Sequence, residues 1–310
     1  MATTNKLNER FVVEKVTEDD LEDIDALGAT VEFNIGIDNL RLYFSTSSTN
    51  WRLVRDERTG KIVAYDAMNL LPNGVNSGWE IVVHPDYQGM GISKNVLAWN
   101  PQLPLLGIST WDTLRNTKLF SHYREKYYCT CARLLSGSLG KSTIGEPVGT
   151  SQKFVIREVG PADLSEIAEY DSKVLGFERV DFLRRFLFVS APSISTLAAW
   201  SDNGVLLGYG HVRHFSIVRA IMPLYADNDE VAWHLLLELA RKIPYGEYIE
   251  AHIAAWSHPT LQFYKEFCSL EEPLCGNYPL IRTCRTTNSL HVLEAIDLQK
   301  VHVIHDYYPV

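Results

Sequence analysis

The chain has 310 residues, of which 46% are hydrophobic and 22% charged, and its formal net charge is −9. This length accommodates two ordinary domains, each with its own core. A negative net charge disfavours nucleic-acid binding, which requires clustered Lys and Arg, so we expect no nucleic-acid partner. The N-terminus lacks the apolar core of a signal peptide, and no apolar run reaches membrane-spanning length. We therefore expect a cytoplasmic protein without a membrane partner.

The first half of the chain begins with a strand at residues 11–16. Thr17 then caps a helix, with an acidic residue three positions further on. Residues 51–56 and 62–71 predict an antiparallel hairpin around the turn at residues 57–60. A further strand leads through a glycine-containing loop into a helix, and another strand and helix follow. Strands and helices therefore alternate in this half.

The second half repeats this order of elements. A strand is expected at residues 154–159, a helix at 164–174, and a hairpin formed by residues 195–201 and 205–213. A helix at residues 231–242 follows the next strand. The similarity is one of pattern and not of residue identity, and a tandem duplication of one unit explains it. The sequence predicts an α/β fold in which each unit has a mixed sheet with helices on both faces.

The boundary between the halves is a stretch rich in Gly, Ser, Thr and Pro at residues 137–153, which predicts a linker. We therefore expect one domain at residues 1–136 and a second at residues 154–310. The linker contains Gly140-Lys-Ser142, which suggests a nucleotide-binding P-loop. That motif requires a glycine five residues earlier, where Leu135 stands, and a following helix, so we reject it.

The most informative segment is Glu80-Ile-Val-Val-His-Pro-Asp-Tyr-Gln-Gly-Met-Gly-Ile-Ser93. It reads as a strand, a glycine loop and a helix that begins near Ile92. Gly89 and Gly91 permit a sharp backbone turn, and the free N–H groups of the helix start then face the loop. Such a helix end attracts anions through its dipole. The segment predicts an anion site, and the alternative is a tight turn without a ligand.

The sequence motif Q-x-x-G-x-S after V-x-P resembles the pyrophosphate loop of the GNAT superfamily of acyl-CoA N-acyltransferases. That family normally has Gly or Ala where Ser93 stands. The resemblance implies a tandem GNAT fold with acetyl-CoA as the cofactor. The residues it assigns to cofactor binding are Val82, Val83, Gln88, Gly89, Met90, Gly91, Ile92, Ser93 and, from the motif described next, Asn116.

A second partial match lies downstream, where the family characteristically has N-x-x-A-x-x-x-Y. Asn116 and Tyr123 match at the same spacing, and Leu119 replaces the small residue. By resemblance, Tyr123 assists departure of the coenzyme A thiolate. Glu80 lies at a position from which several family members project a base, and its alternative interpretation is an exposed carboxylate on a strand edge. The oxyanion donor is expected to be a backbone N–H around Val82 or Val83.

The second half lacks the glycines at the corresponding position. Asp227, Asp229 and Glu230 crowd the start of its helix instead, where acids stabilise the helix dipole and repel a pyrophosphate. We expect this domain to be a degenerate GNAT-like unit that forms a wall of the acceptor cleft or stabilises the first domain. Neither the five cysteines nor the histidine pairs near residues 211 and 302 have a convincing metal-ligand spacing, so no metal is expected.

Together these features predict an N-acetyltransferase that transfers acetyl from acetyl-CoA directly to an amine in a ternary complex. The acceptor is a small-molecule amine or an amine of a peptide or protein. Two alternatives stay open. One is a non-catalytic acyl-CoA-binding or regulatory protein with the same fold, and the other is a transferase for longer acyl groups.

Overall fold

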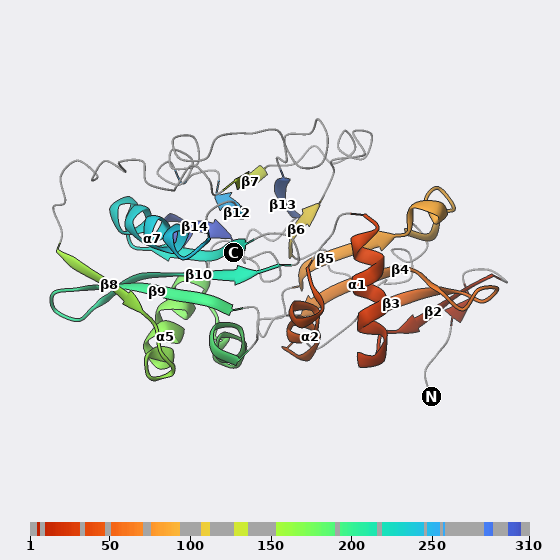
Figure 1. Cartoon of the computed structure of the whole chain (residues 1–310), viewed down its shortest axis with the longest axis horizontal. Coiled ribbons are helices and arrows are strands. Elements are labelled where there is room, and N and C mark those ends of the chain that lie inside the picture. The colour runs from red at the N-terminus through yellow and green to blue at the C-terminus, as the bar shows by residue number, and fades with distance from the viewer. Residues whose placement is uncertain are drawn as a thin grey trace.

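The computed structural model of the chain describes residues 5–6, 10–31, 35–46, 51–70, 76–93, 107–111, 127–135, 153–189, 193–215, 219–244, 247–254, 257, 282–287 and 297–304. The described strands form two sheets that lie side by side along the long axis of the molecule (Figure 1). Helices cover both sheets, so the expected α/β class is confirmed. Of the described strand pairs, only one is parallel and it lies in the second sheet, so the first sheet is antiparallel and not mixed as expected.

The first sheet has five strands in chain order, and every neighbouring pair is antiparallel. Its strands are β1 (Asn5–Lys6), β2 (Phe11–Lys15), β3 (Arg52–Asp56), β4 (Ile62–Leu70) and β5 (Asn76–Val83). The hairpin predicted from the sequence is confirmed as β3 and β4, and Gly60 in its turn has φ of 72°, which glycine adopts without strain.

Two helices cover one face of this sheet, α1 (Leu21–Ala29) and α2 (Ile37–Thr46). A short 3-10 turn, η1 (Glu18–Asp20), precedes α1, and the backbone N–H and Oγ of Thr17 both donate to the Asp20 carboxylate, at 2.9 and 2.7 Å. The bond from the Thr17 N–H satisfies a backbone donor at the helix start, as in a capping box. The predicted cap at Thr17 is therefore confirmed.

The second sheet has nine strands in the order β6-β13-β7-β12-β14-β11-β10-β9-β8. Their bounds are β6 (Gly107–Trp111), β7 (Tyr127–Leu135), β8 (Phe154–Glu158), β9 (Ser193–Ser201), β10 (Leu206–His214), β11 (Arg219–Ala226), β12 (Tyr248–Ala254), β13 (Arg282–Thr287) and β14 (Val301–Ile304). The second predicted hairpin is confirmed as β9 and β10.

Strand pairing in this sheet crosses the middle of the chain. β6 and β7 come from the first half, yet β6 pairs with β13 and β7 pairs with both β13 and β12. The two halves are therefore joined by hydrogen bonds between strands as well as by the chain. The boundaries at residues 1–136 and 154–310 stay predictions, and residues 137–152 of the expected linker lie outside the described residues.

Helices lie on both faces of the second sheet (Figure 1). They are η4 (Pro161–Asp163), α5 (Leu164–Leu175), α6 (Val180–Arg184), the π-helical turn η5 (Arg185–Val189), α7 (Asp229–Arg241) and η6 (Leu298–Lys300). Elements α5 and α6 pack on one face and α7 on the other. A Cβ atom on Gly210 of β10 would lie 2.5 Å from a methyl carbon of Leu239, so glycine permits the close approach of α7.

The two halves share one hydrophobic core, which contains buried residues of α1 and α2 together with residues of α5 and α6. A buried polar contact lies within this junction. Arg213 donates to the carbonyl of Phe186 at 2.8 Å and to the side chain of Asn39, whose amide donates to the carbonyls of Ile35 and His214. Burial lowers the pKa of Arg213 to about 10, so it stays protonated at neutral pH.

A second buried polar cluster lies between α5, α6 and the second sheet. Arg179 donates two hydrogen bonds, at 2.8 and 2.7 Å, to the carboxylate of Asp171, which also accepts from the hydroxyl of Tyr209. Tyr225 joins the cluster at 3.3 Å from Arg179. Burial by itself would lower the pKa of Arg179, but the Asp171 carboxylate raises it well above its usual value. Arg179 is therefore a permanent buried cation.

Candidate functional site: the glycine loop of the first half

The predicted strand and glycine loop are confirmed, and Ile92 and Ser93 after the loop are helical, while the rest of the predicted helix lies outside the described residues. β5 ends at Val83, a 3-10 turn, η2 (Pro85–Tyr87), follows, and a helix begins at Ile92. Gly89 and Gly91 have φ of 81° and 75°, in the left-handed region that other residues rarely adopt. A Cβ on Gly89 would meet no atom within 4 Å, so glycine is needed there for the backbone conformation and not for space.

The loop is exposed, but both of its ends are fixed. Ile92 is only 3% exposed and packs in a cluster with apolar residues of β2, β3 and β4, on the face of the sheet opposite α1. At the other end, the side-chain amide of Gln88 donates to the carbonyl of Val83 at 3.1 Å. Met90 is half exposed and Ser93 is exposed. The helix start is therefore held against the sheet while the loop backbone faces solvent.

A polar cluster that the sequence did not indicate links the start of the glycine loop to the first sheet. The hydroxyl of Tyr87 donates to the Asp56 carboxylate at 3.1 Å, and Arg10 donates to the same oxygen through two nitrogens at 2.8 and 3.1 Å. Arg10 also lies over the rings of Tyr87 and Phe11, at 5.3 and 5.1 Å. The cluster connects the loop to β2 and β3. Its partners lie 31 and 46 positions apart in the sequence, so no local pattern indicates them.

The hydrogen bond from Arg10 lowers the pKa of Asp56 to about 2. Because the folded pKa is below the unfolded value of about 4, this carboxylate stabilises the fold above about pH 4, and the contribution is lost as the pH falls towards 2. We expect Asp56→Asn to lower the melting temperature at pH 6 and to have a much smaller effect at pH 2.5. Thermal unfolding of the wild type and the variant across this pH range, at constant ionic strength, measures how the difference in melting temperature changes. A difference that is the same at every pH would show that the Asp56 carboxylate does not stabilise the fold through its ionised form.

The register of β5 distinguishes between Val82 and Val83. The N–H of His84 donates to the carbonyl of Val63 in β4 at 2.9 Å. Because alternate residues of a strand direct their N–H groups to the same side, the N–H of Val82 also faces β4, and that of Val83 faces the opposite side. The carbonyl of Val83 accepts from Gln88 on that outer side. Of the two residues, only Val83 has a backbone N–H directed to the outer edge.

This outer edge of β5 lies where the two sheets separate. Among the described residues, β5 pairs with β4 only, and it is the last strand of its sheet. The next strand in the chain, β6, is hydrogen-bonded into the second sheet. No described strand therefore pairs with the outer edge of β5 at its carboxyl end, which the glycine loop directly follows. This arrangement suits an extended ligand with a phosphate group at one end.

Of the three remaining predicted site residues, the structure describes the backbone of one. Glu80 lies in β5 with its backbone opposite Ala67, three residues before Val83. Asn116 and Tyr123 lie outside the described residues, so their predicted roles stay predictions.

The corresponding position of the second half is built differently, as the sequence predicts. The side chain of Asn228 accepts from the N–H of Val231 and so caps α7 from within the chain. Asp229 and Glu230 occupy the first turn of the helix. Asp227 accepts from Tyr170 at 3.0 Å and forms an ion pair with Lys300 at 2.9 Å. The Asn228 side chain thus occupies a backbone N–H that an anion could otherwise bind, and the acidic side chains repel an anion from the helix start.

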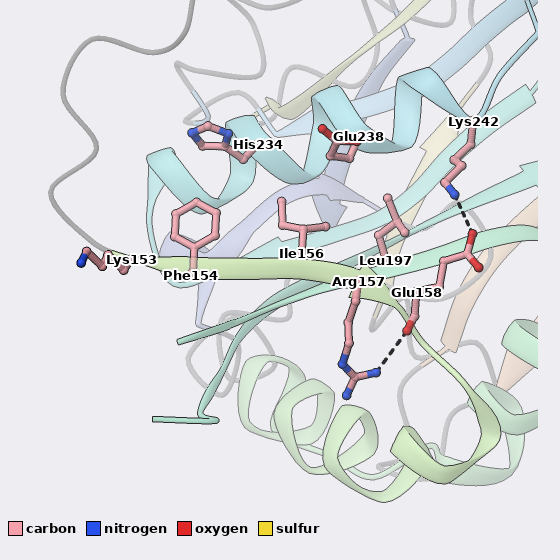
Figure 2. A pocket seen from close by; sticks show the side chains of 9 residues that line it. All are labelled: Lys153, Phe154, Ile156, Arg157, Glu158, Leu197, His234, Glu238 and Lys242. Carbon is pink, nitrogen blue, oxygen red and sulfur yellow. Dashed lines mark hydrogen bonds and ion pairs between the residues drawn. The ribbon is translucent and has the colours of Figure 1, made fainter. Parts of the chain in front are cut away.

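A hollow of about 680 Å³ lies elsewhere, between α7 and the edge strand β8 (Figure 2). Phe154, Ile156 and Leu197 form its apolar floor, and Lys242 pairs with Glu158 at one end, at 2.6 Å. It contains none of the residues predicted for the site. At one end its lysine is already paired with Glu158, and it lies apart from the glycine loop, so it is not the candidate anion site.

No group of three or more His, Cys, Asp or Glu residues suited to a metal ion occurs in the described part of the chain. The described helices include none whose length and apolarity would let it cross a bilayer.

Comparison with known proteins agrees with the fold. Residues 167–263 match a family model described as an acetyltransferase (GNAT) domain. A protein from Pyrococcus horikoshii, proposed to be an acetyltransferase, superposes with a TM-score of 0.63 and 16% identity, covering 99% of this chain and 98% of that one. A tandem GNAT protein from the clavulanic acid biosynthesis pathway has a TM-score of 0.62 and 17% identity, covering 88% of this chain and 97% of that one.

Saccharomyces cerevisiae N-myristoyltransferase, solved with myristoyl-CoA, superposes with a TM-score of 0.53 and 11% identity, covering 81% of this chain and 78% of that one. No curated protein matches the chain by sequence. The architecture is thus that of tandem acyltransferase folds. The second half thus contains a match to a GNAT domain model, and the chain as a whole has the fold of tandem GNAT proteins.

Proposed function

We propose that the chain is an acetyl-CoA-dependent N-acetyltransferase whose cofactor site is the glycine loop of the first half. The observation that carries this proposal is the arrangement at the end of β5. The outward N–H of Val83, the turn at Gly89 and Gly91 and the helix start at Ile92 follow one another at the carboxyl end of this strand. A strand edge can pair with the amides of a pantetheine arm, and a helix start can bind a pyrophosphate.

The proposed reaction forms one C–N bond and breaks one C–S bond. A primary amine with a pKa near 10.4 is only about one part in 2,500 neutral at pH 7, so a base must take its proton before attack. Glu80, three residues before Val83 on β5, is proposed as that base. The thiol of coenzyme A has a pKa of roughly 8.5 by analogy with cysteine, and Tyr123 is proposed to give the departing thiolate its proton.

The oxyanion that develops on the thioester carbonyl needs a fixed donor. The backbone N–H of Val83 is proposed for this role, because its direction away from β4 leaves it facing the edge where the ligand is proposed to lie. The acceptor is proposed to be a small-molecule amine or an amine of a peptide or protein. A screen that measures thiol release from acetyl-CoA against polyamines, amino acids and peptides tests the activity. No release above the uncatalysed rate with any of them would favour the alternative of a non-catalytic acyl-CoA-binding protein.

We expect Tyr123→Phe to slow turnover by about 10- to 100-fold while acetyl-CoA affinity stays within about twofold. Loss of one general acid typically costs 10²-fold or more, but the thiolate is a good leaving group, which reduces the cost. Steady-state kinetics and calorimetric binding of coenzyme A separate the two quantities. Tyr170→Phe is the control for loss of a tyrosine hydroxyl, because that hydroxyl hydrogen-bonds Leu207 and Asp227 of the second half, and it should leave kcat nearly unchanged. A Tyr123→Phe rate equal to wild type would remove Tyr123 from the mechanism.

A further inference from the structure

The C-terminal strand β14 lies inside the second sheet, between two strands that run parallel to each other. It pairs antiparallel with β11 on one side, with Leu224 opposite Val303, and antiparallel with β12 on the other, with Ile253 opposite the same Val303. In Figure 1 it lies in the sheet beside α7. A single short strand thus pairs with the backbone edges of β11 and β12 that face each other.

The space that β14 fills is a wedge created by β11. Strands β11 and β12 pair directly at only two positions, Arg219 with Ile249 and Ala220 with Glu250. Directly beyond them the ladder between β11 and β10 shifts register at a bulge in β11 that contains Pro223, which has no N–H to donate. A bulge bends its strand, so β11 and β12 separate and expose facing rows of backbone N–H and C=O groups.

β14 is held firmly in this wedge. Val301, His302 and Val303 are each at most 2% exposed. The segment before the strand is anchored as well, because Asp297 donates its N–H to a carbonyl of α5 at 2.8 Å and Lys300 forms its ion pair with Asp227 at 2.9 Å. Asp227 directly precedes the N-cap of α7, which is the position that corresponds to the glycine loop. The occupying segment thus contacts both the wedge and the loop of the second half.

The first half shows the opposite arrangement at the equivalent place. β5 corresponds to β11 in element order, and the helix that begins at Ile92 corresponds to α7. Among the described residues no strand pairs with the outer edge of β5. The two units therefore have the same framework, but in the described part of the chain one has no strand paired to the edge beside its glycine loop, whereas the other has its wedge filled by β14.

We propose that β14 is an intramolecular occupant of the acyl-CoA cleft of the second unit, so that each chain binds one acyl-CoA, at the glycine loop of the first unit only. This inference rests on the function proposed above. The pantetheine arm is an extended chain with two amide groups, so a peptide strand that pairs with both walls of the wedge excludes it from the same space. The carboxylates at the start of α7 add repulsion to this exclusion.

The test is the stoichiometry of acetyl-CoA binding to the full chain, measured by equilibrium dialysis with radiolabelled ligand, for the wild type and for Gly89→Asp. We expect one molecule per wild-type chain and at least 100-fold weaker binding to the variant. Two molecules per chain would overturn the occupancy of the second cleft alone. One molecule that binds equally well to Gly89→Asp would overturn both this occupancy and the assignment of the cofactor to the glycine loop. No binding to the wild type would overturn the proposed function and this inference together.

Hydrogen exchange gives an independent readout. The amide protons of residues 301–304 are expected to exchange slowly in the free protein and equally slowly at saturating acetyl-CoA, because the strand stays in place when the first unit is loaded. Faster exchange of these amides on ligand addition would mean that the ligand displaces β14, which would overturn the proposal. Gly204→Asp serves as the control for the binding variant, since Gly204 also has a positive φ, of 76°, and open space around its Cβ position.

Discussion

Replacement of Gly89 by aspartate is expected to weaken acetyl-CoA binding by at least 100-fold. The new carboxylate would lie in the exposed loop at the start of the helix, where the pyrophosphate is proposed to bind. Two unit charges about 5 Å apart repel by roughly 3 kcal/mol at an effective dielectric constant near 20. Each 1.4 kcal/mol is tenfold in affinity, so repulsion alone accounts for about 100-fold. Isothermal titration with coenzyme A measures the change.

Gly204→Asp separates this charge effect from backbone strain. Both glycines have positive φ, 81° for Gly89 and 76° for Gly204, and a Cβ at either position meets no atom within 4 Å. The two substitutions therefore add the same side chain in the same strained conformation, and each should lower stability by about 1 kcal/mol. Only the first places a charge at the proposed pyrophosphate site. Equal loss of affinity in the two variants would refute the assignment of the loop.

The substitution Asp171→Asn is expected to destabilise the fold by about 3 kcal/mol or more. The asparagine has the shape of the aspartate and can still accept from Tyr209, but it leaves the guanidinium of Arg179 buried without its counter-charge. Removal of one partner of a buried ion pair typically costs 3–5 kcal/mol, because the remaining charge keeps its desolvation penalty. Urea denaturation followed by circular dichroism gives the free energy of unfolding.

Asp181→Asn is the matched control, because it makes the same chemical change in an exposed pair. Asp181 pairs with Arg184, and their side chains are 83% and 53% exposed, whereas those of Asp171 and Arg179 are 0% and 1% exposed. Exposed pairs contribute about 0–1 kcal/mol. A similar small change in both variants would show that the buried cluster contributes no more than a surface ion pair.

Much of the fold could be predicted from local sequence. The hairpins, the caps and the amphipathic helices depend on residues within a few positions of one another, such as the Thr17–Asp20 cap and the glycine in each hairpin turn. The strand, loop and helix around Gly89 and Gly91 were predictable for the same reason, since positive φ is a property of the residue itself. The acidic start of α7 was equally visible in the sequence.

Contacts between distant residues could not be predicted in this way. The polar cluster formed by Arg10, Asp56 and Tyr87, the junction of Asn39 with Arg213, and the exchange of β6 and β7 into the second sheet all join residues far apart in the chain. Strand pairing depends on which edges meet after folding, and many pairings satisfy the same alternation of apolar residues.

The sequence by itself determined that this protein has two α/β units, that one unit has a glycine loop suited to an anion, and that the other has acids at that place. Those properties reside in single residues and their near neighbours. Only the tertiary structure decided that Val83 and not Val82 directs its N–H outward, and that the C-terminal strand fills the wedge between β11 and β12. Both follow from strand register and sheet order, which are fixed by the pairing of backbone groups across the whole chain.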